Sequence, residues 1–109
     1  MTRTFVHTKP FRTSWEKMGL NDDDLKQLED VLLENPQEGD VIQHTGGARK
    51  LRIKLEGRGK SGGGRVIYLD IYEAEKTYLL FAYPKNVQEN LTPEQEKAIK
   101  ALVDAIKKE

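Results

Sequence analysis

The sequence has 109 residues, of which 18 are Lys or Arg and 18 are Asp or Glu, so the formal net charge at pH 7 is zero. This length allows one domain with one modest core. No apolar run approaches the roughly 20 residues that span a membrane, and the first residues lack the apolar stretch of a secretory signal. There is no cysteine, and the two histidines are too few for a metal site. We therefore expect a single cytoplasmic domain, residues 1–109, without a metal ion, a cofactor or a membrane partner.

The neutral total hides an uneven distribution of charge. Residues 22–40 contain eight carboxylates and one lysine, whereas residues 49–65 contain seven Lys or Arg and one glutamate. Such a dipolar chain can meet a polyanion with its basic segment while its acidic segment faces solvent or a basic partner.

The first third of the chain has the pattern of a short strand followed by a helical hairpin. Residues 4–7 favour a strand, and Pro10 suits the first turn of a helix. Apolar residues at i, i+4 and i+7 give that helix one buried stripe, and Gly19 is placed to end it. The stripe consists of Phe11, Trp15 and Met18.

A second helix is predicted from Asn21, a good N-cap, to Asn35–Pro36, where the residue before proline disfavours a helix. Its first turn is acidic, which the helix dipole favours, and consists of Asp22, Asp23 and Asp24. Its predicted buried face consists of Leu25, Leu28, Val31 and Leu32.

The second half predicts an antiparallel meander and a C-terminal helix. After a polar connection that contains Thr45-Gly46-Gly47, apolar residues alternate or run together in residues 50–55, 65–72 and 77–83, as they do in strands. Thr92-Pro93-Glu94-Gln95 then forms a capping box for a last helix. Its expected buried residues are Ile99, Leu102, Val103 and Ile106. The fold class is therefore α+β, with an antiparallel sheet, an N-terminal helical hairpin and a C-terminal helix.

The glycine-rich stretch EGRGKSGGGR, residues 56–65, contains Gly-Lys-Ser but does not fit a nucleotide-binding P-loop. That loop needs a glycine where Lys54 stands, and a helix where a strand-like run begins after Gly64. Without that helix, the amides that anchor phosphate at a helix N-terminus are missing. We interpret the stretch as a long basic hairpin connection.

Three cations lie on one face of the first meander strand: Lys50, Arg52 and Lys54. Cations on one face often do no more than solvate the exposed side of an antiparallel sheet. Adjacent like charges nevertheless cost stability unless an anion offsets them. A strand of this kind beside a basic loop is therefore also suited to reading a phosphodiester backbone.

Several segments, in this order along the chain, resemble the RelE/HigB superfamily of bacterial type II toxins, and the HigB-type branch in particular. They are Gly39-Asp40-Val41-Ile42-Gln43, Thr45-Gly46-Gly47-Ala48-Arg49-Lys50-Leu51-Arg52, Arg65-Val66-Ile67-Tyr68 and Tyr83-Pro84-Lys85-Asn86. The resemblance implies a small RelE-like fold and a ribosome-dependent mRNA endonuclease that cuts mRNA in the 30S A site. It also implies a HigA-like helix-turn-helix antitoxin that neutralises the toxin, and through which alone the toxin reaches operator DNA.

Carried onto this sequence, the resemblance assigns site residues for a metal-independent cleavage in which the RNA 2′-hydroxyl attacks the adjacent phosphate. Arg52 and Arg65 hold the phosphate, because a planar guanidinium fork suits its oxygens. Lys50 or Lys54 transfers a proton, since crowding by cations lowers the pKa of a lysine. Tyr83 stacks on a base or orients one, although a tyrosine in a strand is more commonly part of the core. The expected contacts to RNA backbone or ribosome are Arg49, Arg58, Lys60 and Lys85.

Some features depart from RelE and leave other functions open. RelE has an Arg and a Tyr after the last strand, whereas residues 86–92 here contain neither. One alternative is a ParE-like toxin that poisons DNA gyrase, although the cationic row argues for a phosphate ligand. The other is a non-catalytic module that binds nucleic acid. His44 and Asp70 are expected to be structural.

Overall fold

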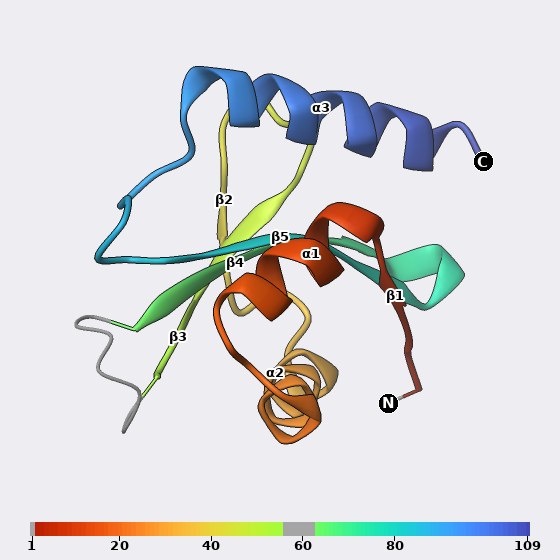
Figure 1. Ribbon diagram of the computed structural model, residues 1–109. Helices are drawn as coiled ribbons and strands as arrows, with labels where there is room; N and C mark the ends of the chain where they lie inside the picture. Colours follow the sequence, from red (N-terminus) through yellow and green to blue (C-terminus); the bar gives the residue numbers. More distant parts are fainter. Residues whose placement is uncertain (1, 56–62) are drawn as a thin grey trace.

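The computed structural model describes residues 2–55 and 63–109, in which a five-stranded sheet carries helices on both faces (Figure 1). The strand order in the sheet is β1-β5-β4-β3-β2. Helix α3 lies along one face, and α1 and α2 lie on the other (Figure 1). The elements are β1 (Thr4–His7), α1 (Lys9–Lys17), α2 (Asp22–Glu34), β2 (Asp40–Val41), β3 (Arg49–Ile53), β4 (Gly64–Ile71), a 3-10 turn (Tyr72–Ala74), β5 (Lys76–Pro84) and α3 (Pro93–Lys107).

The three central strands form the predicted antiparallel meander, and the α+β fold class is confirmed. Strand β4 pairs with β3 on one side and with β5 on the other. The structure adds an edge strand at each side: β1 pairs in parallel with β5, and the two-residue β2 pairs with β3. The sheet is therefore mixed. The sequence predicts no strand at β2, because two residues are too few to show a periodic pattern.

The helix boundaries follow from the caps that the sequence predicted. Asn21 and Asp24 form a capping box at the start of α2, and Thr92 and Gln95 form one at the start of α3. At the start of α1, the Thr8 hydroxyl accepts a hydrogen bond from the Phe11 amide and donates one to the Leu79 carbonyl oxygen. That second bond ties α1 directly to β5.

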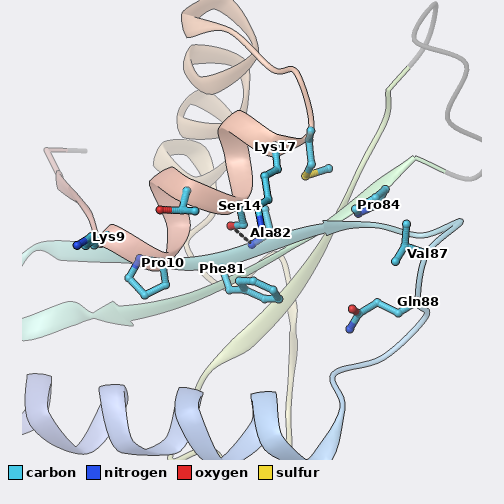
Figure 2. Close-up of a pocket in the computed structure, with 11 residues that line it drawn as sticks. Lys9, Pro10, Ser14, Lys17, Phe81, Ala82, Pro84, Val87 and Gln88 are labelled. Atoms are coloured by element: carbon cyan, nitrogen blue, oxygen red, sulfur yellow. Dashed lines mark hydrogen bonds between the residues drawn. The ribbon is translucent and has the colours of Figure 1, made fainter.

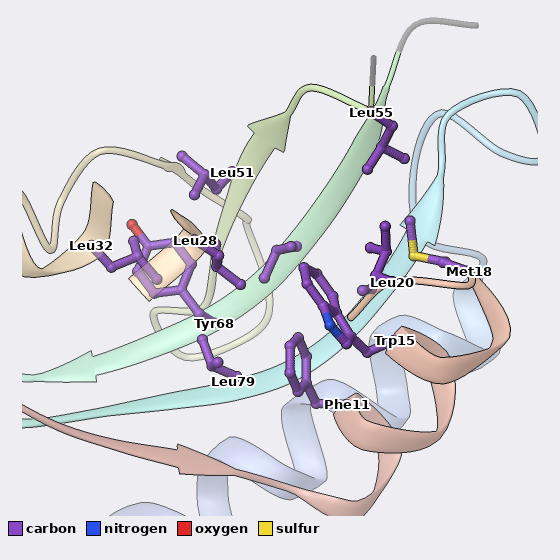
Figure 3. Close-up of a cluster of buried hydrophobic side chains, with 12 residues drawn as sticks. Phe11, Trp15, Met18, Leu20, Leu28, Leu32, Leu51, Leu55, Tyr68 and Leu79 are labelled. Atoms are coloured by element: carbon purple, nitrogen blue, oxygen red, sulfur yellow. The ribbon is translucent and has the colours of Figure 1, made fainter. Parts of the chain in front are cut away.

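Two hydrophobic clusters lie on the two faces of the sheet. The first joins α1 and α2 to the sheet, and Figure 3 shows Phe11 and Trp15 of α1 pointing toward it. The second lies under α3 and includes the predicted core residues Ile99 and Val103, with Leu102 and Ile106 half-buried at its edge. One core prediction was wrong: Val31 is 42% exposed, because it lies on the flank of α2 while Leu28 and Leu32 take the buried positions.

Within the described ranges, 2–55 and 63–109, no helix combines the length and the apolar character needed to cross a bilayer.

Candidate active site

Three polar side chains form a row across the sheet, near the last residue of β3 and the first residue of β4. Arg52 of β3 pairs with Arg65 of β4, and Arg65 pairs with Tyr83 of β5. Residues that pair directly on neighbouring strands point to the same face of a sheet. Tyr83 belongs to the cluster under α3, so the row lies on the α3 face. The strand register therefore brings together three of the predicted site residues that are far apart in the sequence.

Arg65 occupies the centre of the row and is buried, with only 3% of its surface exposed. One guanidinium nitrogen, Nη1, donates a hydrogen bond of 3.0 Å to the Gly64 carbonyl oxygen. The other, Nη2, lies 3.5 Å from Glu89 Oε1, and the Glu89 side chain is 50% exposed. Lys85 Nζ lies 3.7 Å from the second carboxylate oxygen of Glu89. Two predicted cations thus meet at one carboxylate that the sequence analysis did not single out.

Lys50 is linked to Arg65 and Lys85 through the connection that carries Glu89, because it contacts the next residue, Asn90. It lies two residues before Arg52 on β3, hence on the same face, and its Nζ donates a 2.9 Å hydrogen bond to Asn90 Oδ1. The connection between β5 and α3 therefore supplies Glu89 and Asn90 to the site. No periodic pattern marks these two residues, and strand register alone does not reveal them.

Tyr83 closes the row on β5 and is almost wholly buried. Its hydroxyl donates a 3.3 Å hydrogen bond to the main-chain oxygen of Glu89. Burial raises the pKa of Tyr83 to about 12, which the nearby Arg65 opposes and the Glu89 carboxylate reinforces. The phenol is therefore neutral at physiological pH. It is both a core residue and a member of the row, so the two interpretations of this residue are compatible.

The raised pKa of Tyr83 predicts a loss of stability in strong alkali. The unfolded phenol ionises near its ordinary value of 10.0 while the folded one keeps its proton until about pH 12, so the free energy of unfolding falls between those values. The loss due to Tyr83 should reach about 2–3 kcal/mol. Urea unfolding at pH 9 and pH 11.5 checks this: Tyr83→Phe should show a smaller decrease than wild type. Equal decreases would contradict it.

The remaining predicted residues lie outside the row or at its margin. Lys54 is exposed and follows the end of β3. Arg49 turns to the opposite face, where its Nη1 donates a 2.7 Å hydrogen bond to the Gly39 carbonyl oxygen, so the structure does not bring it together with the others. Asp70 accepts hydrogen bonds from Arg3 and Thr77, which suits a structural role. Arg58 and Lys60 lie outside the described residues.

A large cavity lies between α1 and the end of β5, and none of the three side chains of the row lines it. It has a volume of about 710 Å³ and is lined by α1, by the end of β5 and by Val87 and Gln88 (Figure 2). Its lining is largely apolar, whereas the row has two guanidinium groups and a phenol, with the ammonium groups of Lys50 and Lys85 and the carboxylate of Glu89 next to it. In the described part of the chain, no three His, Asp or Glu side chains are grouped as a metal site. The row and its neighbours, by contrast, combine fixed positive charge with groups that can transfer protons.

Comparison with known proteins shows the family of the chain. Residues 2–108 match the family described as the RelE toxin of the RelE/RelB toxin–antitoxin system. The chain belongs to the RelE toxin family.

Solved structures of RelE share its fold. The chain is similar to a doubly substituted Escherichia coli RelE in the free state, with a TM-score of 0.56 and 19% identity over 82% of this chain and 90% of that one. It is also similar to a chain of the intact E. coli RelBE toxin–antitoxin complex, with a TM-score of 0.54 and 20% identity over 76% of this chain and 96% of that one. The same substituted RelE in complex with a RelB peptide gives a TM-score of 0.51 and 23% identity, over 85% and 98%. At these identities the likeness is one of fold.

Proposed function

We propose that this RelE-family toxin is a metal-independent mRNA endonuclease that acts in the A site of the ribosome. The observation that carries the proposal is the direct pairing of Arg52 with Arg65 on the α3 face of the sheet. Two arginines at directly paired positions on one face of the sheet can together bind the oxygens of one phosphodiester and stabilise the extra charge of its pentacoordinate transition state. A toxin with a protein target has no evident need for such a pair.

The reaction needs no protein nucleophile. The RNA 2′-oxygen attacks the adjacent phosphorus, the bond from phosphorus to the 5′-oxygen breaks, and the products end in a 2′,3′-cyclic phosphate and a 5′-hydroxyl. Arg52, which is exposed, and Arg65 bind the phosphate. Lys50 or Lys54 takes part in proton transfer, and Tyr83 orients the nucleotide. Lys85 contacts the backbone.

In the structure without RNA, the Glu89 carboxylate covers Arg65. Their nitrogen and oxygen atoms are 3.5 Å apart, longer than a hydrogen bond, and the carboxylate is half exposed. Because Arg65 is almost wholly buried, loss of this partner without a replacement would be costly. A phosphate that binds both arginines supplies an anion in its place, so one anion can exchange for another.

We further propose that a cognate antitoxin binds and neutralises the toxin; E. coli RelE forms a complex with the antitoxin RelB. The ordered segments from Gly39 to Arg52 favour the HigB-type branch and hence a HigA-like helix-turn-helix antitoxin. Operator DNA would then be reached only through the antitoxin. A ribosomal target places the activity in the cytoplasm.

Primer extension on mRNA from translating ribosomes tests the proposed function. We expect new 5′ ends within codons when the toxin is added, and none on the same mRNA without ribosomes. A parallel assay with DNA gyrase separates the alternatives: inhibition of gyrase with intact mRNA would identify a ParE-like toxin. Binding to ribosomes with neither effect would identify a non-catalytic module.

A further inference from the structure

We propose that Glu89 is the general base that removes the proton from the attacking 2′-hydroxyl. This inference rests on the proposed cleavage of mRNA and assigns one of its steps to a residue. Glu89 lies on the connection between β5 and α3, and its carboxylate is 3.5 Å from Arg65 Nη2 and 3.7 Å from Lys85 Nζ. Half of its side chain is exposed, so RNA that reaches the row can also reach this carboxylate.

Glu89 is suited to accept a proton where its neighbours are not. Arg65 and Lys85 contact its carboxylate, Lys50 contacts the next residue, Asn90, and Arg52 pairs with Arg65 on the neighbouring strand. A charged Lys or Arg side chain donates hydrogen bonds and accepts none. An ionised carboxylate is an acceptor only. The phenol of Tyr83 keeps its proton at neutral pH, because burial raises its pKa to about 12. Among these described side chains, the carboxylate of Glu89 is therefore the group that is suited to take a proton.

The position of the carboxylate also fits the geometry of the reaction. In a reactive conformer the 2′-oxygen lies about 3–3.5 Å from the phosphorus that it attacks. A base must come within about 2.6–3.2 Å of the hydroxyl. A carboxylate that already lies against the guanidinium that binds the phosphate is therefore within reach of the 2′-hydroxyl once that phosphate is bound.

Contacts other than the one to Arg65 keep Glu89 at the site. Its main-chain oxygen accepts the hydrogen bond from the Tyr83 hydroxyl, and the next residue, Asn90, accepts one from Lys50. Lys85 lies four residues earlier in the chain, and its Nζ is 3.7 Å from the second carboxylate oxygen. When the phosphate takes the place of the carboxylate on Arg65, these contacts hold Glu89 beside the ribose.

The proton balance then closes within the site. Glu89 takes the proton from the 2′-hydroxyl as the bond from the 2′-oxygen to phosphorus forms. Lys50 gives a proton to the 5′-oxygen as its bond to phosphorus breaks. Exchange with water returns Glu89 to the carboxylate and Lys50 to the ammonium form, and no oxidant, reductant or other reactant is needed.

The test is single-turnover cleavage of mRNA bound to ribosomes at saturating toxin, with wild type, Glu89→Gln and Glu89→Asp. We expect Glu89→Gln to cleave about 100- to 10,000-fold more slowly, the range for loss of a general base. Glu89→Asp should keep part of the rate, because it retains a carboxylate that can take a proton but is set back by one methylene group. Glu73→Gln, an exposed glutamate in the turn between β4 and β5, is the matched control and should cleave at the wild-type rate.

Cleavage by Glu89→Gln at the wild-type rate or faster would overturn the inference. A faster rate would show that Glu89 is only an anion that covers Arg65. Urea unfolding of each variant excludes a loss of fold as the cause of a lower rate. Failure of the proposed function gives a different result, because wild type itself would then produce no 2′,3′-cyclic phosphate ends.

Discussion

Replacement of Arg65 by alanine is expected to slow mRNA cleavage on the ribosome by about 100- to 1000-fold, which corresponds to about 2.7–4 kcal/mol in the barrier. Arg65 lies at the centre of the row, between Arg52 and Tyr83, and its guanidinium is fixed by its hydrogen bond to the Gly64 carbonyl oxygen. A charge that is already in place stabilises the transition state without reorganisation. Single-turnover cleavage, measured by primer extension at saturating toxin, gives the effect directly.

Two further variants separate catalysis from folding. Arg65 is buried, so alanine also leaves a cavity and removes the partner of Glu89, and the folded fraction must be measured by urea unfolding. Arg52→Ala removes the neighbouring guanidinium from an exposed position and should slow cleavage with little change in stability. Arg12→Ala, an exposed arginine on α1 on the other face of the sheet, is the matched control and should leave the rate unchanged.

The size of the effect distinguishes the roles that an arginine can have. An exposed contact to RNA backbone contributes on the order of 1 kcal/mol or less, and its contribution shrinks as salt is raised. A catalytic guanidinium costs far more, and its loss remains at saturating toxin and higher salt. If Arg65→Ala cleaved at the wild-type rate while folded, the catalytic role assigned to the row would be wrong.

Most of the fold could be predicted because it follows local rules. The caps at Asn21 and Thr92 and the alternation in β3 are each determined by a few neighbouring residues. The edges of the sheet are different. Strand β1 pairs with β5, more than 70 residues away in the register Thr4 with Lys76, and nothing in residues 4–7 specifies a parallel partner. Pairing at that separation is decided by tertiary packing.

Some residues of the site can likewise be predicted from local patterns, whereas others are brought to it only by the folded chain. Alternation along β3 predicted that Lys50 and Arg52 share a face. The register of the meander places Arg65 beside Arg52 and Tyr83 beside Arg65. The same alternation puts Arg49 on the opposite face, where it holds the Gly39 carbonyl oxygen. Glu89 could not be found in this way. It lies on a connection without a period, and only the folded chain shows which cations it faces.

The largest expected loss of stability comes from Phe11→Ala on α1. Phe11 is 1% exposed, and its ring stacks on Trp15 with centroids 5.2 Å apart in the cluster that joins α1 and α2 to the sheet (Figure 3). Removal of a buried phenylalanine side chain lowers the free energy of unfolding by about 3–5 kcal/mol, because apolar burial is lost and a cavity remains. Urea unfolding at pH 7 measures the change. Val87→Ala, at a residue that is 72% exposed, is the control and should stay within about 0.5 kcal/mol of wild type.

Phe11→Ala also provides a second check on the row. Small domains have a total stability of about 5–15 kcal/mol, so this variant should be partly unfolded or depleted in cells and less toxic. The rate of cleavage per folded molecule should nevertheless equal that of wild type, since Phe11 lies on the face opposite to Arg65. Arg65→Ala should show the reverse: folded protein with a slow reaction. If Phe11→Ala lowered the rate of the folded fraction as much as Arg65→Ala does, the reaction would depend on the packing of α1 rather than on the charges of the row.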